Sequence, residues 1–246
     1  MKLGILETGY VPEEMITGHG GFPEMFGALF CSADPSIQIA AYPVADGTLP
    51  DSPNACDAWL VTGSKHGVYD NLPWMAPLKT FLRTARSAGV PMIGICFGHQ
   101  IMAEAFGGRA EKSGKGWGCG VHGYEVQHRP GWMGDTPSAF DMHAMHQDQV
   151  TAIPEDATVL ATSAFCENAM LTYGDPEQPD AISIQPHPEF TTPFARDLVE
   201  TRKGTVIADA VADVALESLG RDVANQAFAR WAVAYLRDAL ARKAAA

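Results

Sequence analysis

Short apolar runs alternate with helical patterns through the first hundred residues, and this alternation limits the possible folds more than any other feature of the chain. The apolar runs occupy residues 2–7, 37–44, 58–63 and 91–96, and the helical patterns occupy residues 22–31 and 75–89. Buried parallel strands are continuous apolar runs, and strands that alternate with helices indicate an α/β fold. We therefore expect a mainly parallel central sheet flanked by helices, with a ligand site at the carboxyl ends of its strands.

A different pattern begins after Gly108. Residues 114–128, GKGWGCGVHGYEVQH, are rich in glycine and then alternate apolar and polar positions, which predicts hairpin-like strands. The sheet should therefore become partly mixed. Shorter strands are expected at residues 158–163, 169–173 and 181–185.

The C-terminal segment has a wholly helical pattern from about Pro193, with a break expected at Gly220. We predict one domain at residues 1–192, on which the helices of residues 193–246 pack as a C-terminal extension. A stripe of apolar and aromatic side chains on the last helix indicates either this packing or a homodimer face: Phe228, Trp231, Val233 and Leu236.

Charge and cysteine content narrow the class of protein. The chain carries 17 basic and 29 acidic side chains, and its net charge of −12 argues against nonspecific binding to nucleic acid or to an anionic membrane. No stretch approaches the roughly 20 apolar residues that cross a bilayer, and the N-terminus lacks the apolar run of about 7 to 15 residues of a signal peptide. Five cysteines without a CxxC pair indicate reduced thiols. We expect a cytoplasmic protein that acts on small molecules.

Cys96 lies between two glycines in the segment GICFGHQIM, residues 94–102, where an apolar run meets the start of a helix. This is the G-x-Nuc-x-G pattern of a nucleophile elbow. A tight strand-to-helix turn strains the backbone at the nucleophile, so glycines on both sides relieve crowding, and the helix N-terminus favours thiolate over thiol. A lone GxCxG fits a buried cysteine at the end of a strand equally well, so a second signal has to decide.

The second signal is IQPHPEF, residues 184–190, which follows another apolar run. In an extended segment the side chains of His187 and Glu189 project to the same side. An imidazole oriented by a carboxylate activates a thiol, because the ring accepts the proton and the carboxylate stabilises the imidazolium. Taken alone, HPE also fits a surface turn. Because both motifs follow apolar strands, we expect Cys96, His187 and Glu189 to meet at one sheet edge.

A third motif is VTGSKHGVYD, residues 61–70, where an apolar strand ends in a glycine turn. Acyl transfer needs backbone N–H groups aimed at the developing oxyanion, each contributing on the order of 3 kcal/mol. The elbow offers the N–H of Phe97, and this loop offers that of Ser64 or Gly63. An ordinary strand-to-helix loop is the alternative interpretation of this motif.

These three motifs, together with MHQDQVTAIP at residues 145–154, resemble the class I glutamine amidotransferases over about residues 1–192. CFGHQ, KGWGCGV, HQDQV and HPEF more narrowly resemble the stand-alone GMP-synthetase-like branch, some of whose members are γ-glutamyl peptidases. Two features depart from the family. The usual glycine-glycine-proline loop is Gly63-Ser64-Lys65 here, and no ATP-pyrophosphatase domain follows, so GMP synthesis by this chain alone is not expected.

The resemblance implies a flavodoxin-like fold and a cysteine hydrolase with a Cys-His-Glu triad and no cofactor. Cys96 would attack the γ-carboxamide of glutamine or of a γ-glutamyl compound to form a thioester, with His187 as acid and base and Glu189 as its partner. Gln100 matches the substrate-contacting glutamine of the family. A solvated helix residue is the alternative for this position.

Other functions remain open at this point. The chain can be a glutaminase subunit that delivers ammonia to a separate synthetase such as GMP synthetase, or a non-catalytic binding or regulatory module. A cysteine enzyme of the α/β-hydrolase type is disfavoured by the early oxyanion loop and the closely linked HPE. The substrate's leaving group and the residues that hold its amino-acid end are not determined by these motifs.

Some candidate sites are rejected. Asp141, His143, His146 and Asp148 are metal-ligand types, but no further ligand sits at metal spacing, so we expect no metal. GKGWGCG lacks the Walker pattern of Lys followed by Ser or Thr. The resemblance implies instead that this segment borders the pocket for the substrate's amino-acid end. Three of the remaining cysteines are expected to fill core or surface positions, and Cys119 to approach the site without a partner base.

Overall fold

The computed structural model of the protein describes residues 1–245, which form a nine-stranded sheet and a separate two-stranded sheet. The strands of the large sheet lie in the order β2-β1-β3-β4-β11-β10-β9-β6-β7, and β5 pairs with β8. The strands are β1 (Lys2–Leu6), β2 (Gln38–Tyr42), β3 (Ala58–Val61), β4 (Met92–Ile95), β5 (Arg109–Lys112), β6 (Gly118–Val126), β7 (Ala139–His146), β8 (Asp148–Ala152), β9 (Ala157–Thr162), β10 (Met170–Tyr173) and β11 (Ala181–Ile184).

The large sheet has a parallel half and an antiparallel half. Strands β2, β1, β3, β4 and β11 pair in parallel, whereas β10, β9, β6 and β7 continue the sheet through antiparallel pairs. The prediction of a mainly parallel, partly mixed sheet is therefore confirmed. The strands expected at residues 158–163, 169–173 and 181–185 are β9, β10 and β11, displaced by at most one residue at either end.

The prediction of more than one strand within residues 114–128 was wrong. That segment contains only β6, whose antiparallel partner β7 lies beyond a connection that includes a 3-10 helix, η3 (Gly131–Met133). Glycines in this segment permit close packing as well as turning. A Cβ on Gly120, where φ is +85°, would lie 2.3 Å from Oγ of Ser218 in a helix packed on β6.

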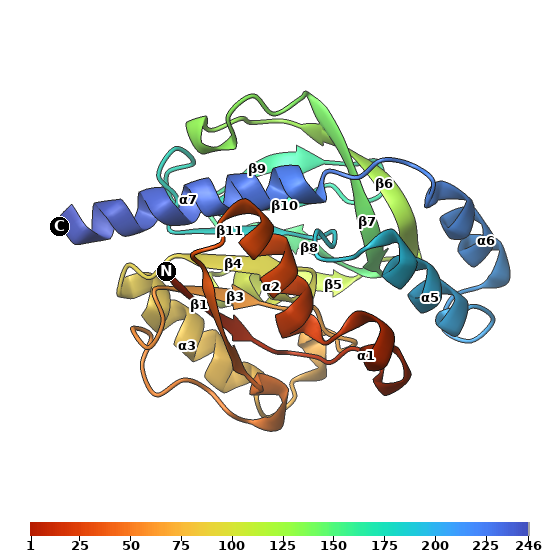
Figure 1. Cartoon of the computed structure of the whole chain (residues 1–246), viewed down its shortest axis with the longest axis horizontal. Coiled ribbons are helices and arrows are strands. Elements are labelled where there is room, and N and C mark those ends of the chain that lie inside the picture. Colours follow the sequence, from red (N-terminus) through yellow and green to blue (C-terminus); the bar gives the residue numbers. More distant parts are fainter. Residues whose placement is uncertain (246) are drawn as a thin grey trace.

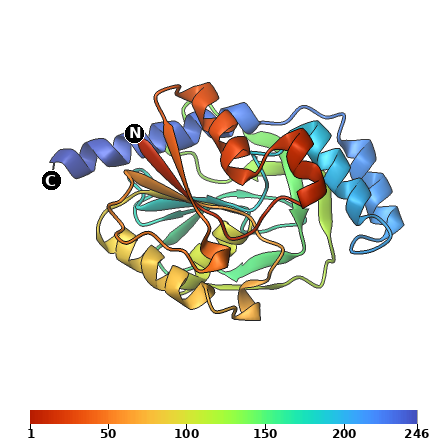
Figure 2. The same cartoon turned by 60° about the horizontal axis from the view of Figure 1, so that its bottom comes forward.

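Helices cover both faces of the sheet (Figures 1 and 2). The chain forms α1 (Glu13–His19), α2 (Phe22–Ala33), α3 (Met75–Ser87), α4 (Phe97–Ala105), α5 (Thr192–Arg202), α6 (Asp209–Ser218) and α7 (Asn225–Ala245), with 3-10 turns η1 (Val44–Asp46) and η2 (Val68–Asp70). Successive strand residues face opposite sides, so Met92 joins a core with α3 and α4, whereas Ile93 joins a core with α2 and α7.

The apolar stripe of the last helix belongs to the second of these cores. The interpretation of this stripe as a homodimer face was wrong, because its side chains are buried within the chain against α2 and the antiparallel half of the sheet. The four side chains are Phe228, Trp231, Val233 and Leu236. A homodimer would have to use another surface.

Helices α5 and α6 lie at one end of the molecule, and α1 lies beside α5 (Figure 2). Nε2 of His19 in α1 lies 2.7 Å from Oδ2 of Asp197 in α5, and the His19 ring meets that of Phe194 edge-on. Two segments far apart in sequence are thus joined next to the carboxyl ends of the parallel strands.

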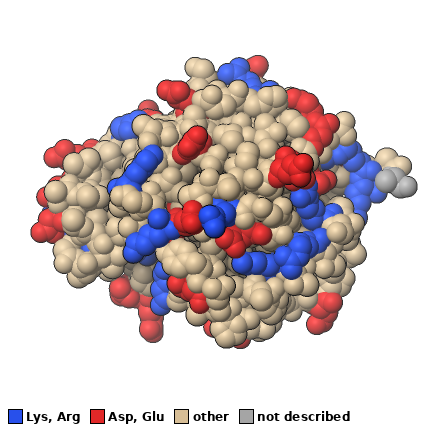
Figure 3. All heavy atoms as spheres, turned by 180° about the vertical axis from the view of Figure 1, so that it is seen from behind, with Lys and Arg blue, Asp and Glu red and all other residues tan. Residues whose placement is uncertain are grey.

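The surface mixes charges of both signs. On the face in Figure 3, acidic and basic side chains lie side by side. Within residues 1–245, no helix combines the length and the apolar content needed to cross a membrane.

Candidate active site

Three neighbouring parallel strands end at the same edge of the sheet. Ile95 at the end of β4 pairs with Ile184 at the end of β11, and the N–H of Cys96 donates to the carbonyl oxygen of Ile184 at 2.9 Å. His187 lies three residues beyond β11, and Gly63 two residues beyond β3, which adjoins β4. Strand pairing therefore brings the three sequence motifs to one place.

Cys96 occupies a strained turn between β4 and α4. Its φ of +54° and ψ of −104° lie in a region that costs side-chain-bearing residues about 1–3 kcal/mol. Both flanking glycines are required by close packing. A Cβ on Gly94 would lie 2.6 Å from Sδ of Met102, and a Cβ on Gly98 would lie 2.2 Å from the carbonyl oxygen of Val61. The elbow is therefore held tightly against β3.

His187 and Glu189 contact each other in the interior. Nδ1 of His187 lies 2.7 Å from Oε1 of Glu189, and their side chains are 5% and 0% exposed. The segment is a turn rather than the extended strand that was expected, and the backbone N–H of His187 donates to the carbonyl oxygen of His143. The ring of Phe190 stacks on the imidazole with centroids 4.0 Å apart. The ring is thus fixed on three sides.

The imidazole also adjoins the thiol. A Cβ on Gly63 would lie 3.2 Å from Cε1 of His187 and 3.7 Å from Cβ of Cys96, so the two side chains flank the same small space. Burial lowers the pKa of His187, but the Glu189 carboxylate and a Cys96 thiolate raise it further, and the net pKa lies well above the ordinary value. Nε2 of His187 makes no hydrogen bond to an oxygen or nitrogen atom of residues 1–245.

The three expected oxyanion donors lie around the same space. Phe97 is the first residue of α4, so its N–H has no acceptor within the helix. Gly63 and Ser64 both line cavities that the thiol also lines. The N–H of Gly98 donates to the carbonyl oxygen of Thr62 at 3.1 Å, which ties this loop to α4. The donors therefore come from two connected segments.

Gln100 is buried, so the alternative of a solvated helix residue was wrong. Its Nε2 donates to the carbonyl oxygen of Asp148 at 3.0 Å and to Oε1 of Gln185 at 3.1 Å. The side chain therefore links α4 to β8 and to the segment after β11, and it borders a cavity beside Cys96.

Two cavities of about 420 and 430 Å³ meet at Cys96. The thiol-bearing residue is 5% exposed, and that exposed part faces these cavities. The residues that border both are Ser64, Lys65, Cys96, Met145 and Arg202.

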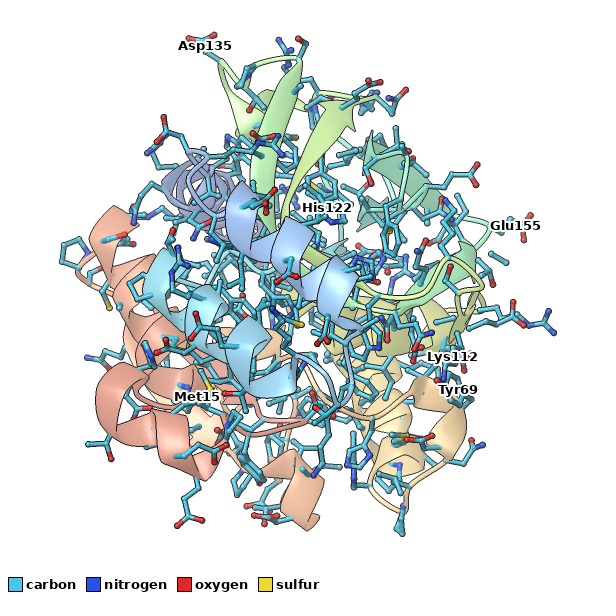
Figure 4. All side chains as sticks on the ribbon, turned by 90° about the vertical axis from the view of Figure 1, so that its right-hand side faces the viewer. Met15, Tyr69, Lys112, His122, Asp135 and Glu155 are labelled. Atoms are coloured by element: carbon cyan, nitrogen blue, oxygen red, sulfur yellow. The ribbon has the colours of Figure 1, made fainter. Side chains whose placement is uncertain are left out.

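The first cavity has polar walls. The hydroxyl of Tyr69 donates to Oδ1 of Asp148 at 3.1 Å, and Lys112 lies close to Tyr69 (Figure 4). Trp117 of the glycine-rich segment and Gln100 also line this cavity. It therefore offers charges of both signs, which suits the amino and carboxyl groups of an amino acid.

Sequence reasoning missed two residues of the site. Arg202, at the end of α5, borders both cavities and forms no ion pair with another residue of 1–245. His143 was considered only as a metal ligand, yet its carbonyl oxygen anchors His187. Burial lowers the pKa of His143 to about 4, and the positive charge of His187 acts in the same direction. No local motif marks either residue, because α5 and β7 reach the site only through the fold.

The other cysteines lie off the site. Cys119 is buried behind Met145, with 3.8 Å between their sulfur atoms, and burial raises the pKa of its thiol to about 12. Cys56 and Cys166 are buried, and Cys31 is half-buried. Among the described residues, no group of three or more His, Cys, Asp or Glu side chains is arranged to hold a metal ion.

Comparison with known proteins adds independent findings. The sequence model of the family described as Glutamine amidotransferase class-I matches residues 54–201. Gamma-glutamyl peptidase 3 of Arabidopsis thaliana is 28% identical over 190 residues, 74% of each chain. The glutamine-hydrolyzing subunit of the GMP synthase of Methanothrix thermoacetophila is 36% identical over 104 residues, 42% of this chain and 55% of that protein.

A solved structure has the same fold. The crystal structure of a glutamine amido transferase from Methylobacillus Flagellatus superposes with a TM-score of 0.71 and covers 96% of this chain and 94% of that chain, at 22% identity. The likeness therefore extends beyond the matched family segment to both ends of the fold.

Proposed function

Because this chain belongs to the class I glutamine amidotransferase family, we propose that it hydrolyses the γ-carboxamide of glutamine or of a γ-glutamyl compound through a thioester on Cys96. The observation that carries the proposal is the buried 2.7 Å contact between His187 and Glu189, whose imidazole adjoins the thiol. Such a carboxylate holds the imidazole in one tautomer and stabilises its protonated form.

The reaction has two halves. In the first, the Cys96 thiolate attacks the γ-carbonyl carbon, and the carbon–nitrogen bond breaks as Nε2 of His187 gives its proton to the leaving amine. In the second, His187 accepts a proton from water, the resulting hydroxide attacks the thioester carbon, and the carbon–sulfur bond breaks. Glutamate and the free amine are the products.

The oxyanion of each tetrahedral intermediate needs donors within about 3 Å. We assign this role to the N–H of Phe97 and to that of Ser64 or Gly63. The helix dipole of α4 adds positive potential at the same point, because Cys96 immediately precedes its first turn. These donors are pre-positioned, since the strained elbow and the loop are bonded to each other.

A γ-glutamyl peptidase activity is favoured by the relative whose similarity covers 74% of both chains and whose name states that activity. Delivery of ammonia to a separate synthetase is the second candidate. It is supported by the 36% identity to the glutamine-hydrolyzing subunit of a GMP synthase, over a shorter segment. The two candidates share the thioester chemistry and differ in the group that leaves and in the need for a partner.

Release of glutamate by the purified protein tests the proposal. The substrates are glutamine, γ-glutamyl dipeptides and glutathione, and the variants are Cys96→Ala and, as a matched control, Cys166→Ala, which removes a buried thiol away from the site. We expect hydrolysis that C96A abolishes and C166A retains. Hydrolysis that survives in C96A, or no hydrolysis of any substrate, would contradict it. A large increase in glutaminase activity on adding a synthetase would favour the ammonia donor.

A further inference from the structure

The two cavities that meet at Cys96 contact different residues of the site. His187 borders only the second cavity, whereas Gln100 and Asp148 border only the first. Cys96 and Ser64 border both. A substrate carbon held at the thiol therefore has one substituent on the Gln100 side and the other on the His187 side.

Proton transfer decides which substituent lies on which side. The leaving nitrogen must lie within hydrogen-bond reach of Nε2 of His187 to receive its proton. The leaving group consequently extends into the second cavity. The glutamyl group occupies the first cavity, where Lys112, Asp148 and Tyr69 supply polar partners.

The second cavity is built for a group much larger than ammonia. Its volume is about 430 Å³, whereas a water-sized molecule occupies about 30 Å³ in the liquid. Apolar side chains that are individually almost fully buried border it, and they come from α2, α5 and the loops before α1 and α5: Val11, Phe22, Phe190, Phe194 and Leu198.

Aromatic rings continue from the imidazole into this wall. Phe190 stacks on His187, and the ring of Phe194 meets that of Phe190 edge-on with centroids 4.6 Å apart. His19 of α1 supports the far side of Phe194 at 5.3 Å. The wall is therefore rigid, and it begins directly where the leaving nitrogen must be protonated.

We propose that the second cavity binds the leaving group of γ-glutamyl amides whose amine carries an apolar or aromatic side chain, such as a γ-glutamyl dipeptide with phenylalanine or leucine as its second residue. This proposal rests on the proposed function. An apolar leaving group removes its own surface and that of the wall from water, whereas glycine or ammonia leaves the wall unfilled. Phe194 is the specificity-determining residue, because it lies deepest in the row of rings.

The test compares kcat/KM for γ-glutamyl-phenylalanine, γ-glutamyl-leucine, γ-glutamylglycine and glutamine. We expect the first two to exceed γ-glutamylglycine by about 10-fold or more, since pockets discriminate apolar groups by about 10- to 200-fold. Phe194→Ala should reduce this ratio by about 10-fold. Phe81→Ala is the matched control, because it removes a buried ring that packs on Trp59, outside both cavities, and should leave the ratio unchanged.

Binding provides a readout if F194A folds poorly. With Cys96→Ala, which retains both cavities and lacks the thiol, calorimetry should show tighter binding of γ-glutamyl-phenylalanine than of γ-glutamylglycine. Equal kcat/KM values for the dipeptides, equal affinities, or an unchanged ratio in folded F194A would overturn the cavity assignment while leaving the proposed hydrolysis intact. Absence of glutamate release from every substrate would overturn both.

Discussion

Nδ1 of His187 lies 2.7 Å from Oε1 of Glu189, and the protein keeps this pair out of water. In such surroundings a charge is stable only beside its partner, so the carboxylate holds the pKa of the imidazole high against the effect of burial.

Glu189→Gln removes this negative charge while keeping the shape of the side chain. The pKa of His187 should fall, because burial then acts against the charged ring with less opposition. We expect kcat to drop by about 100-fold or more, as general acid–base catalysis contributes roughly 10²–10⁴. The pH profile of kcat should lose its limb assigned to His187, measured by glutamate release. An unchanged profile would exclude the carboxylate from the mechanism.

Strain at the elbow predicts an unusual stability order. Cys96→Gly should be more stable than Cys96→Ala by about 1 kcal/mol in the free energy of unfolding, because glycine adopts a φ of +54° without crowding. Both variants should lack hydrolysis. Urea unfolding of the two proteins provides the comparison. A more stable alanine variant would show that the turn relaxes once the thiol is absent.

Gly98 should not tolerate a methyl group. Gly98→Ala places Cβ 2.2 Å from the carbonyl oxygen of Val61, so α4 must move away from β3 and the bond from Gly98 to Thr62 must stretch. We expect a loss of about 1–3 kcal/mol, typical of overpacking, together with lower kcat. Gly18→Ala, in α1 with open space around its Cβ, is the control and should stabilise the protein by about 0.5–1 kcal/mol. Urea unfolding measures both changes, and a G98A protein as stable as the wild type would contradict the packing argument.

Arg202 should contribute to substrate binding. The guanidinium borders the glutamyl cavity without an ion-pair partner among residues 1–245, so it can bind the substrate carboxylate. Arg202→Leu should raise KM by about 10- to 100-fold, corresponding to the roughly 1.5–3 kcal/mol of a charged hydrogen bond. Arg202→Lys should recover part of that loss. If the leucine variant keeps its KM, the guanidinium does not contact substrate.

Two histidines buried away from the triad predict sensitivity to acid. Burial lowers the pKa of His99 and of His146 to about 3 each, and a backbone hydrogen bond opposes it only weakly. Below about pH 6.5 the unfolded chain binds protons that the folded protein excludes, so the free energy of unfolding falls with decreasing pH. Each histidine should contribute about 1.4 kcal/mol per pH unit between pH 6.5 and 3.

Chemical unfolding at several pH values measures this slope. His99→Gln should reduce it by one histidine's share, whereas His128→Gln, whose side chain is 43% exposed, should leave it unchanged. Identical slopes for the wild-type protein and H99Q would mean that the His99 ring is protonated in the folded state.

The elements that the sequence predicted are those with local patterns. Continuous apolar runs marked the parallel strands, and glycines around Cys96 marked the elbow, because backbone crowding at that turn depends on adjacent residues. The partner of β6 was missed, since the pairing of β7 depends on a segment that begins more than ten residues later. Helix α1 and strands β5 and β8 were also not predicted, and they are short.

The sequence by itself determined the fold class, the family and the three motifs that end neighbouring strands. Only the tertiary structure decided what surrounds them: the turn that joins His187 to Glu189, the position of Arg202, and the aromatic wall from Phe190 to Phe194. The reason is physical. Backbone geometry and strand burial depend on nearby residues, whereas a cavity forms where α5 and the segment before α1 pack together, and no local pattern encodes that contact.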